Sequence, residues 1–327
     1  MKHPALLLLL VPTILCTAAE RPNIVLLLAD DLGWGDVGYH GGPIATPNID
    51  RLAAEGVRLE NFHVAPLCSP TRAGLMTGRW PIRYGMGSQV ITPWRKWGLP
   101  TTEHTIADML GAAGYERRGC IGKWHLGHSQ PMLQPTQRGF TFFYGHYNGA
   151  IDYFTLNREG ERVWHRNDAP SPDEGYATDL IGREAVRFIE AATPGEPFFL
   201  YVPFNAPHTP FQANEEDIAK YSTIENEKQR IYYAMVDSMD QAIGSILSAL
   251  DKKNLTANTV VLFMSDNGGI STIPGANGPW RSSKGNVHEG GIRVPAVVRW
   301  PAGIKGGRQV DALSGYIDVY PTLQALA

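Results

Sequence analysis

Three stretches of the sequence predict an α/β protein built on a large, mainly parallel sheet. Residues 23–29, 197–202 and 259–265 are apolar runs without period-two alternation, as in strands buried on both faces. Helical patterns separate these runs, and strand-helix alternation places the carboxyl ends of parallel strands along one edge of a sheet. We therefore expect a mainly parallel, mixed central sheet with helices on both faces.

The other elements follow from local signals taken in chain order. Residues 46–56 carry a threonine cap, an early proline and a final glycine, which predict a short helix. A strand over 57–64 then leads to a helix that begins at Cys68. Further along we expect helices over 105–113, 176–192 and 226–250, strands over 115–122 and 292–298, loops over 79–103 and 130–171, and a helix beginning near Tyr320.

Composition limits the class of protein. The chain has 327 residues, enough for one large domain or two smaller ones, and its 43% hydrophobic and 19% charged content is typical of a globular protein. A net charge of −3, without a run of Lys and Arg, argues against a nucleic-acid binder. Because binding to phosphate backbones needs a basic face, we expect no nucleic-acid partner.

The first residues have the order of a signal peptide. Lys2 and His3 precede an apolar run over 5–15, and small residues follow at 17–19. The apolar run is too short for an ordinary membrane-spanning helix. We expect residues 1–19 to be removed and the mature protein to be exported, without stable membrane association; a retained N-terminal anchor is the alternative.

Removal of that segment leaves two cysteines, Cys68 and Cys120. An exported protein could join them in a disulfide, in which case Cys68 would be structural. If they stay unpaired, a cysteine at a helix start needs a chemical reason, because a helix N-terminus favours anions and lowers the pKa of a thiol. Cys68 is then either a nucleophile beside an anion site or a small buried residue in a turn.

Carboxylates and an amide follow two of the buried strands. Asp30 and Asp31 end the first, and Asp266 and Asn267 end the run over 259–265. Adjacent carboxylates repel each other, so a bound cation would keep both ionised. A set of oxygen ligands suits a hard divalent cation, and we expect Ca²⁺ before Mg²⁺.

Basic side chains are expected at the same edge of the sheet. They are Arg72, Lys123, His125, His208 and Lys284. A metal and cations beside a helix-end cysteine would together handle an anionic ester, since they stabilise charge that develops on the transferred group. One histidine or lysine would then protonate the leaving oxygen.

Two segments resemble the signature regions of the type I sulfatases. They are Cys68-Ser69-Pro70-Thr71-Arg72, continued to Arg79, and Gly122-Lys123-Trp124-His125-Leu126-Gly127. The resemblance runs from Arg21 to the end of the chain and includes Asp30-Asp31, Pro207-His208, Ser265-Asp266-Asn267-Gly268 and Lys284. It is greatest to arylsulfatase B-like enzymes, which act on 4-sulfated N-acetylgalactosamine.

The resemblance implies an alkaline-phosphatase-like fold over residues 20–327 and a sulfuric ester hydrolase that acts on a sulfated sugar or aryl sulfate. In this family a formylglycine-generating enzyme oxidises the motif cysteine, so Cys68 would become an aldehyde, and Cys120 a core residue. One hydroxyl of the aldehyde hydrate would attack sulfur. The second would then expel sulfate.

The resemblance also implies a role for each site residue. The metal ligands would be Asp30, Asp31, residue 68, Asp266 and Asn267. His208 or Lys284 would protonate the leaving alcohol, and His125 would act as the base that releases sulfate. Arg72 and Lys123 would hold the hydrate and balance charge around the metal.

Two alternatives and one departure accompany this interpretation. A phosphatase or phosphonate monoester hydrolase of the same superfamily would favour the same metal edge, and a non-catalytic binding protein would keep a thiol at Cys68. Family members usually continue into a small C-terminal subdomain, whereas this sequence stops at Ala327, inside a predicted helix. We therefore expect that subdomain to be missing from this sequence.

Overall fold

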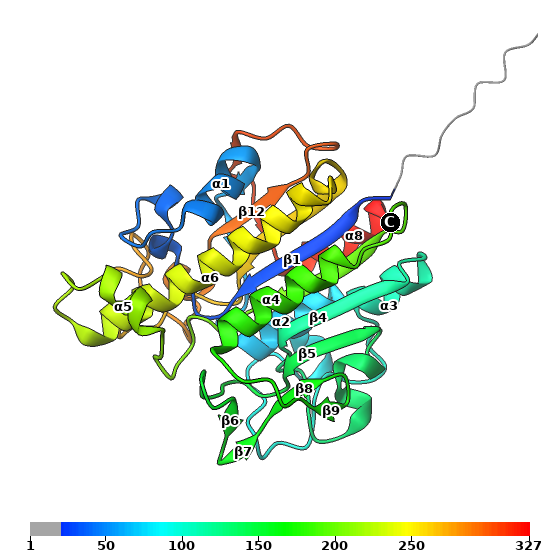
Figure 1. The fold of residues 1–327 in the computed structure, drawn as a ribbon, viewed down its shortest axis with the longest axis horizontal. Coiled ribbons are helices and arrows are strands. Elements are labelled where there is room, and N and C mark those ends of the chain that lie inside the picture. Colours follow the sequence, from blue (N-terminus) through cyan, green and yellow to red (C-terminus); the bar gives the residue numbers. More distant parts are fainter. Residues whose placement is uncertain (1–20) are drawn as a thin grey trace, which may run out of the picture.

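A mixed sheet of ten strands runs through residues 21–327, the part of the chain that the computed structural model describes (Figure 1). The predicted signal peptide lies outside these residues. In spatial order the strands are β13 (Arg308–Val310), β2 (Val57–Leu59), β12 (Ala296–Arg299), β11 (Thr259–Ser265), β1 (Asn23–Ala29), β10 (Phe198–Pro203), β4 (Arg117–Lys123), β5 (Phe142–His146), β8 (Trp164–Arg166) and β9 (Ala169–Pro170).

The middle of the sheet is parallel. β1 pairs in parallel with β11 on one side and β10 on the other, and β4 and β5 continue the parallel order. Antiparallel strands flank this block, with β12 beside β11 and β8 beside β5. Every residue of β1, β10 and β11 is buried, as expected for apolar strands covered on both faces. The predicted fold class is thus confirmed.

Helices cover both faces of the sheet. On one face, α4 and α6 pack against each other and, with α1, enclose a core against the sheet; Figure 1 shows α4 and α6 in front of the sheet. The opposite face packs against α2, α3 and α8. The helices of these two layers are α1 (Pro47–Glu55), α2 (Cys68–Thr77), α3 (Ile106–Ala112), α4 (Ala177–Glu190), α6 (Glu227–Lys252) and α8 (Val319–Leu326).

Short elements complete the described chain. They are two-stranded pairs β3 (Phe62–His63) with β14 (Ser314–Gly315) and β6 (Asn157–Arg158) with β7 (Glu161–Arg162), and the helices α5 (Glu215–Lys220) and α7 (Glu289–Ile292). Among the helices described, none has the length and apolar character that a membrane crossing requires.

Most of the predicted elements are confirmed, including the three apolar strands and the helix that begins at Cys68. Three predictions need correction. The strand expected over 57–64 is two short strands, β2 and β3, which belong to different sheets, and the strand expected over 292–298 begins only at Ala296, after α7. The segment 130–171 is not irregular: it supplies the sheet strands β5, β8 and β9.

Candidate active site

The carboxylates meet at the carboxyl edge of the parallel block. β1 and β11 are in register, with Ala29 beside Ser265, so the next residues of the two strands, Asp30 and Asp266, lie next to each other. The backbone N–H of Asp31 donates to Oδ1 of Asp266 at 3.3 Å. All three carboxylates are buried, and together with buried Asn267 they form the acidic centre that the sequence predicted.

Helix α2 points its first residue at this centre. Cys68 is the first residue of the helix and is buried, and Leu67 before it is extended. The Ser69 hydroxyl donates to the backbone oxygen of His125 at 3.1 Å, which fixes the helix start against the segment after β4. Charges on Lys123, Lys284, Asp266 and Asp30 all act on the Cys68 thiol, so this side chain lies among the predicted site residues.

Arg72, one turn further along α2, connects three parts of the site. Its Nε donates to Oδ2 of Asp266 at 2.9 Å, and its Nη1 donates to the backbone oxygen of Lys123 at 2.7 Å. Its Nη2 also lies 3.5 Å from Oδ2 of Asp30. Because the guanidinium is fully buried, these ion pairs hold α2 against the ends of β1, β4 and β11.

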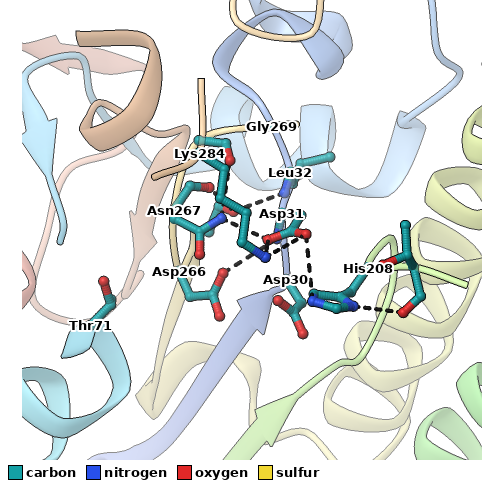
Figure 2. Close-up of polar contacts among 12 residues, drawn as sticks. Asp30, Asp31, Leu32, Thr71, His208, Asp266, Asn267, Gly269 and Lys284 are labelled. Carbon is teal, nitrogen blue, oxygen red and sulfur yellow. Dashed lines mark hydrogen bonds and ion pairs between the residues drawn. The ribbon is translucent and has the colours of Figure 1, made fainter. Parts of the chain in front are cut away.

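Two lysines provide further positive charge beside the carboxylates of Asp30 and Asp31. Lys123, the last residue of β4, donates from Nζ to Oδ2 of Asp30, and Nζ of Lys284 lies 2.6 Å from Oδ1 of Asp31. Figure 2 shows Lys284 reaching down to Asp31 from a loop above the sheet edge. Three carboxylates (Asp30, Asp31 and Asp266) therefore face three cations (Arg72, Lys123 and Lys284).

Two oxygens in this centre have no partner among the described residues. Oδ1 of Asp30 and Oδ1 of Asn267 are buried without a hydrogen bond, although Nδ2 of Asn267 donates to Oδ1 of Asp31 at 2.7 Å. Buried acceptors without donors are costly unless a cation or water satisfies them. Ligand atoms of Asp30, Asp31 and His208 also lie within 4.8 Å of one another. The donor set thus fits a hard divalent cation.

Burial and neighbouring charges move the carboxylate pKa values in opposite directions. Burial acts to raise the pKa of Asp31, but His208 and Lys284 outweigh it and bring the pKa to about 2. Burial and the adjacent charge of Asp30 raise the pKa of Asp266 to about 6. Asp31 is thus held ionised, while Asp266 binds a proton more readily than an ordinary aspartate.

Of the two alternatives for Cys68, a thiol with a lowered pKa is not supported. Burial raises the pKa of this thiol, and the nearby ammonium groups of Lys123 and Lys284 do not offset the loss of water. The helix N-terminus argument overlooked this desolvation. Cys68 and Cys120 are both free and buried, so the alternative of a disulfide between them is also excluded.

The two histidines contact different parts of the structure, and His125 contacts the backbone of Ile91. Nε2 of His125 lies 2.9 Å from the backbone oxygen of Ile91, while Nδ1 has no partner among the described residues. The backbone at His125 is left-handed (φ 56°), so its side chain does not continue the alternation of strand β4. Burial and the charge of Lys123 hold its pKa well below the usual range.

His208 approaches the acidic centre from the loop after β10. Its Nε2 lies 3.8 Å from Oδ2 of Asp31, and its Nδ1 is 2.6 Å from the backbone oxygen of Thr209, as Figure 2 shows. Burial lowers the pKa of His208 to about 4, even though Asp31 acts to raise it. His208 and Lys284 therefore both face the same carboxylate.

One buried polar residue beside the site escaped sequence reasoning. His146, the last residue of β5, is paired in register with Lys123 and is fully buried, and neither of its ring nitrogens makes a hydrogen bond of good geometry with a described residue. The signal that could have found it is the strand-end rule that located Asp30 and Asp266. It was missed because residues 142–146 were assigned to a loop.

Fold and site together define an α/β protein in which buried carboxylates and basic side chains meet at the carboxyl edge of the parallel sheet. Comparison with known proteins names the family: the Sulfatase family model matches residues 22–327. The chain therefore belongs to the sulfatase family, as the two signature segments predicted.

Curated relatives agree with this placement. The chain is 38% identical over 316 residues to mouse arylsulfatase J, covering 94% of this chain and 53% of the relative. It is 37% identical over 335 residues to human N-acetylgalactosamine-6-sulfatase, covering 95% of this chain and 63% of the relative. The chain thus spans between about half and two thirds of these relatives. The particular resemblance to arylsulfatase B-like enzymes stays a prediction.

Solved structures share the fold. Ps i-CgsB, crystallised in complex with k-i-k-neocarrahexaose, is 37% identical, with a TM-score of 0.89 over 94% of this chain and 72% of that chain. The PsFucS1 sulfatase from Pseudoalteromonas sp. is 30% identical, with a TM-score of 0.79 over 94% of this chain and 67% of that one. These likenesses extend over almost all of the described residues.

Proposed function

We propose that this protein hydrolyses sulfate esters and releases inorganic sulfate, with residue 68 as the nucleophile. The observation that carries the proposal is the position of Cys68, at the first turn of α2 among Lys123, Lys284, Asp266 and Asp30. Cations at this point suit an anionic sulfate ester. Membership of the sulfatase family supports the same reaction class.

The raised pKa of Cys68 argues against an unmodified thiolate as the nucleophile. A buried thiol that keeps its proton is a poor nucleophile, because the thiolate is the reactive form. We propose that a formylglycine-generating enzyme converts Cys68 to formylglycine. The hydrated aldehyde would supply two hydroxyl groups at one carbon, one for attack on sulfur and one whose deprotonation allows sulfate to leave.

The acidic centre is the proposed Ca²⁺ site, with Mg²⁺ less favoured. Asp30, Asp31, Asp266 and Asn267 would hold the ion together with residue 68, and the unpartnered oxygens of Asp30 and Asn267 support this donor set. A bound divalent cation would polarise the sulfate oxygens. Because the carboxylates and cations of the site already balance, the added positive charge would favour an anionic substrate.

The remaining side chains would bind the sulfate and move protons. Arg72 and Lys123 lie against Asp30 and would balance charge around the nucleophile. His208 and Lys284 face Asp31 from two elements, and either would deliver a proton to the leaving alcohol. His125, with one ring nitrogen that has no partner among the described residues, would accept the proton whose removal releases sulfate.

The proposed substrate is a sulfated carbohydrate, with aryl sulfates as simple substitutes. One relative is an N-acetylgalactosamine-6-sulfatase, and a structural neighbour was crystallised in complex with k-i-k-neocarrahexaose, which supports a sulfated sugar. We also propose export of the mature protein, on the basis of the charged, apolar and small-residue order of residues 1–19.

Hydrolysis of 4-nitrophenyl sulfate and 4-nitrophenyl phosphate, measured in parallel with Ca²⁺ present, tests the proposal. We expect the sulfate to be the better substrate and Cys68→Ala to abolish its turnover. Mass spectrometry of the peptide that contains Cys68 should find the aldehyde. Preference for the phosphate would instead favour a phosphatase or phosphonate monoester hydrolase, and a thiol without sulfate release would favour a binding protein.

A further inference from the structure

The loop over 91–97 starts at the active site itself. The backbone N–H of Ile91 donates to the Ser69 hydroxyl at 3.2 Å, and the Ile91 oxygen lies 2.9 Å from Nε2 of His125. Ser69 directly follows Cys68 in α2. The loop therefore begins between the residue after the nucleophile and one of the two site histidines.

Further contacts hold this loop along the segment that follows His125. Nε2 of His128 lies 2.9 Å from the oxygen of Pro93, the Ser129 hydroxyl donates to the oxygen of Lys96 at 2.7 Å, and the N–H of Leu99 donates to the oxygen of Leu126 at 2.7 Å. Hydrogen bonds thus hold the backbone of the loop at Pro93, Lys96 and Leu99. These contacts fix the path of the loop backbone relative to His125.

A tight turn projects the middle of the loop into solvent. The N–H of Arg95 donates to the oxygen of Thr92 at 2.9 Å, with Pro93 in the second position, where proline is favoured. Trp94 in the third position is 72% exposed, and Arg95 and Lys96 are exposed beside it. An exposed aromatic ring beside two exposed cations presents an apolar face and positive charge to the same ligand.

Trp94 stays close to the site. It is three positions along the chain from Ile91, so their Cα atoms are at most about 11 Å apart. A second loop borders Cys68, where the N–H of Gly285 donates to the oxygen of Pro66 at 2.8 Å, immediately after Lys284. The nucleophile therefore lies near the bases of two loops, and the one over 91–97 adds an aromatic ring and two cations.

We propose that Trp94, Arg95 and Lys96 form a subsite for the sugar unit next to the one that carries the reacting sulfate. The indole face would pack on the apolar face of a sugar ring, and the two cations would pair with a second sulfate or carboxylate. The subsite rests on the proposed function and narrows its substrate class. The substrate is an anionic oligosaccharide with more than one charged group.

The test compares two substrates in the same variants. For each enzyme, kcat/KM is measured for a carrageenan or chondroitin sulfate hexasaccharide and for 4-nitrophenyl sulfate, which has no second ring. In Trp94→Ala, and in Arg95→Ala combined with Lys96→Ala, the ratio of oligosaccharide to aryl sulfate kcat/KM should fall at least tenfold, mainly through KM. An unchanged ratio for both hexasaccharides in both variants overturns the inference.

Trp80 provides the matched control. Trp80 is 55% exposed and follows the C-terminal end of α2, whereas Cys68 begins this helix, which is about 15 Å long. Its ring packs edge-on against that of Tyr316, with 6.0 Å between the ring centroids. Trp80→Ala should leave the substrate ratio within twofold of wild type. A tenfold fall in this control would mean that loss of any exposed tryptophan has the same effect, and would also overturn the inference.

A binding measurement separates this inference from the proposed function. Calorimetry with Cys68→Ala, with and without Trp94→Ala, follows binding of the same hexasaccharides without turnover. If no sulfate ester is hydrolysed but a hexasaccharide binds at least tenfold more weakly without Trp94, the proposed function fails and the subsite stands. If hydrolysis is observed but binding is equal with and without Trp94, the subsite fails and the proposed function stands.

Discussion

Arg72 and Asp266 form a buried ion pair that joins helix α2 to the end of β11. Both Nε and Nη2 of the guanidinium lie 2.9 Å from Oδ2 of the carboxylate, and both side chains are fully buried. The Arg72 guanidinium also reaches Asp30 and the backbone of Lys123. Arg72 thus connects α2 with the carboxyl ends of β1, β4 and β11.

Removal of this guanidinium should destabilise the fold as well as the site. Arg72→Ala leaves buried Asp266 without its ion-pair partner and removes one of the two cations beside Asp30, a change that costs about 3–5 kcal/mol in the free energy of unfolding. Arg72→Lys keeps the charge but not the planar fork, so its loss should be smaller. Urea denaturation measures both; exposed Arg83→Ala should stay within about 0.5 kcal/mol of wild type. A loss below about 1 kcal/mol in Arg72→Ala would contradict the role assigned to the pair.

Asp36 gives the fold a pH dependence outside the acidic centre. Its Oδ2 accepts hydrogen bonds from the N–H of Gly33 at 2.8 Å and from the Tyr232 hydroxyl at 2.6 Å, but burial still raises its pKa to about 7. An unfolded aspartate has a pKa near 3.9. Between about pH 4 and 7 the folded state therefore keeps a proton that the unfolded state has lost, and stability falls as pH rises through this window.

Asp36→Asn should remove this contribution, because the amide oxygen can accept the same hydrogen bonds and does not ionise. Relative to wild type, the unfolding free energy of the variant should rise by about 1.4 kcal/mol for each pH unit between 4 and 7 and then level off. Urea denaturation at pH 5, 6, 7 and 8 measures the difference. A difference that stays constant over these values would show that Asp36 is ionised throughout.

Calcium should stabilise the folded protein through the acidic centre. A ligand that binds only the folded state at 100 times its dissociation constant adds about 2.7 kcal/mol. The melting temperature should therefore be higher in Ca²⁺ than in EDTA, with a smaller effect of Mg²⁺. The shift is compared within each variant: Asp30→Asn and Asn267→Ala should lose most of it, and exposed Asp311→Asn should keep it. Equal melting temperatures of the wild type in Ca²⁺ and EDTA would count against the metal site.

The centre of the fold could be predicted because its strands carry unambiguous signals. β1 and β11 are apolar at nearly every position, and both end in carboxylates, so periodicity and the strand-end rule together located Asp30 and Asp266. The edge of the sheet was harder to predict. β5 reads Phe-Phe-Tyr-Gly-His within an aromatic, glycine-containing segment, and its identity as a strand depends on pairing with β4, which no local pattern encodes.

The chemical state of the site could not be predicted in the same way. A helix N-terminus and two lysines beside Cys68 suggested a lowered thiol pKa, but the balance depends on how completely water is excluded. The direction of the His125 ring likewise depends on a left-handed backbone and a contact with Ile91, a residue 34 positions away. Both features arise from the packing of distant segments.

Close backbone packing beside Lys123 leads to a last prediction. Gly122 has φ 134°, and a Cβ there would lie 2.0 Å from the backbone oxygen of Pro203 in β10. Because backbone cannot move aside as a side chain can, Gly122→Ala should push β4 and β10 apart, at a cost of about 1–3 kcal/mol beyond the strain of its φ.

Gly160→Ala isolates the effect of a positive φ, since Gly160 has φ 84° and a Cβ there would meet no atom within 4 Å, and it should cost about 1 kcal/mol. Urea denaturation ranks the two variants, and equal losses would mean that the β4–β10 contact yields without cost. Aryl sulfate turnover should fall only in Gly122→Ala, because the displaced strands carry Lys123 and lead to His208.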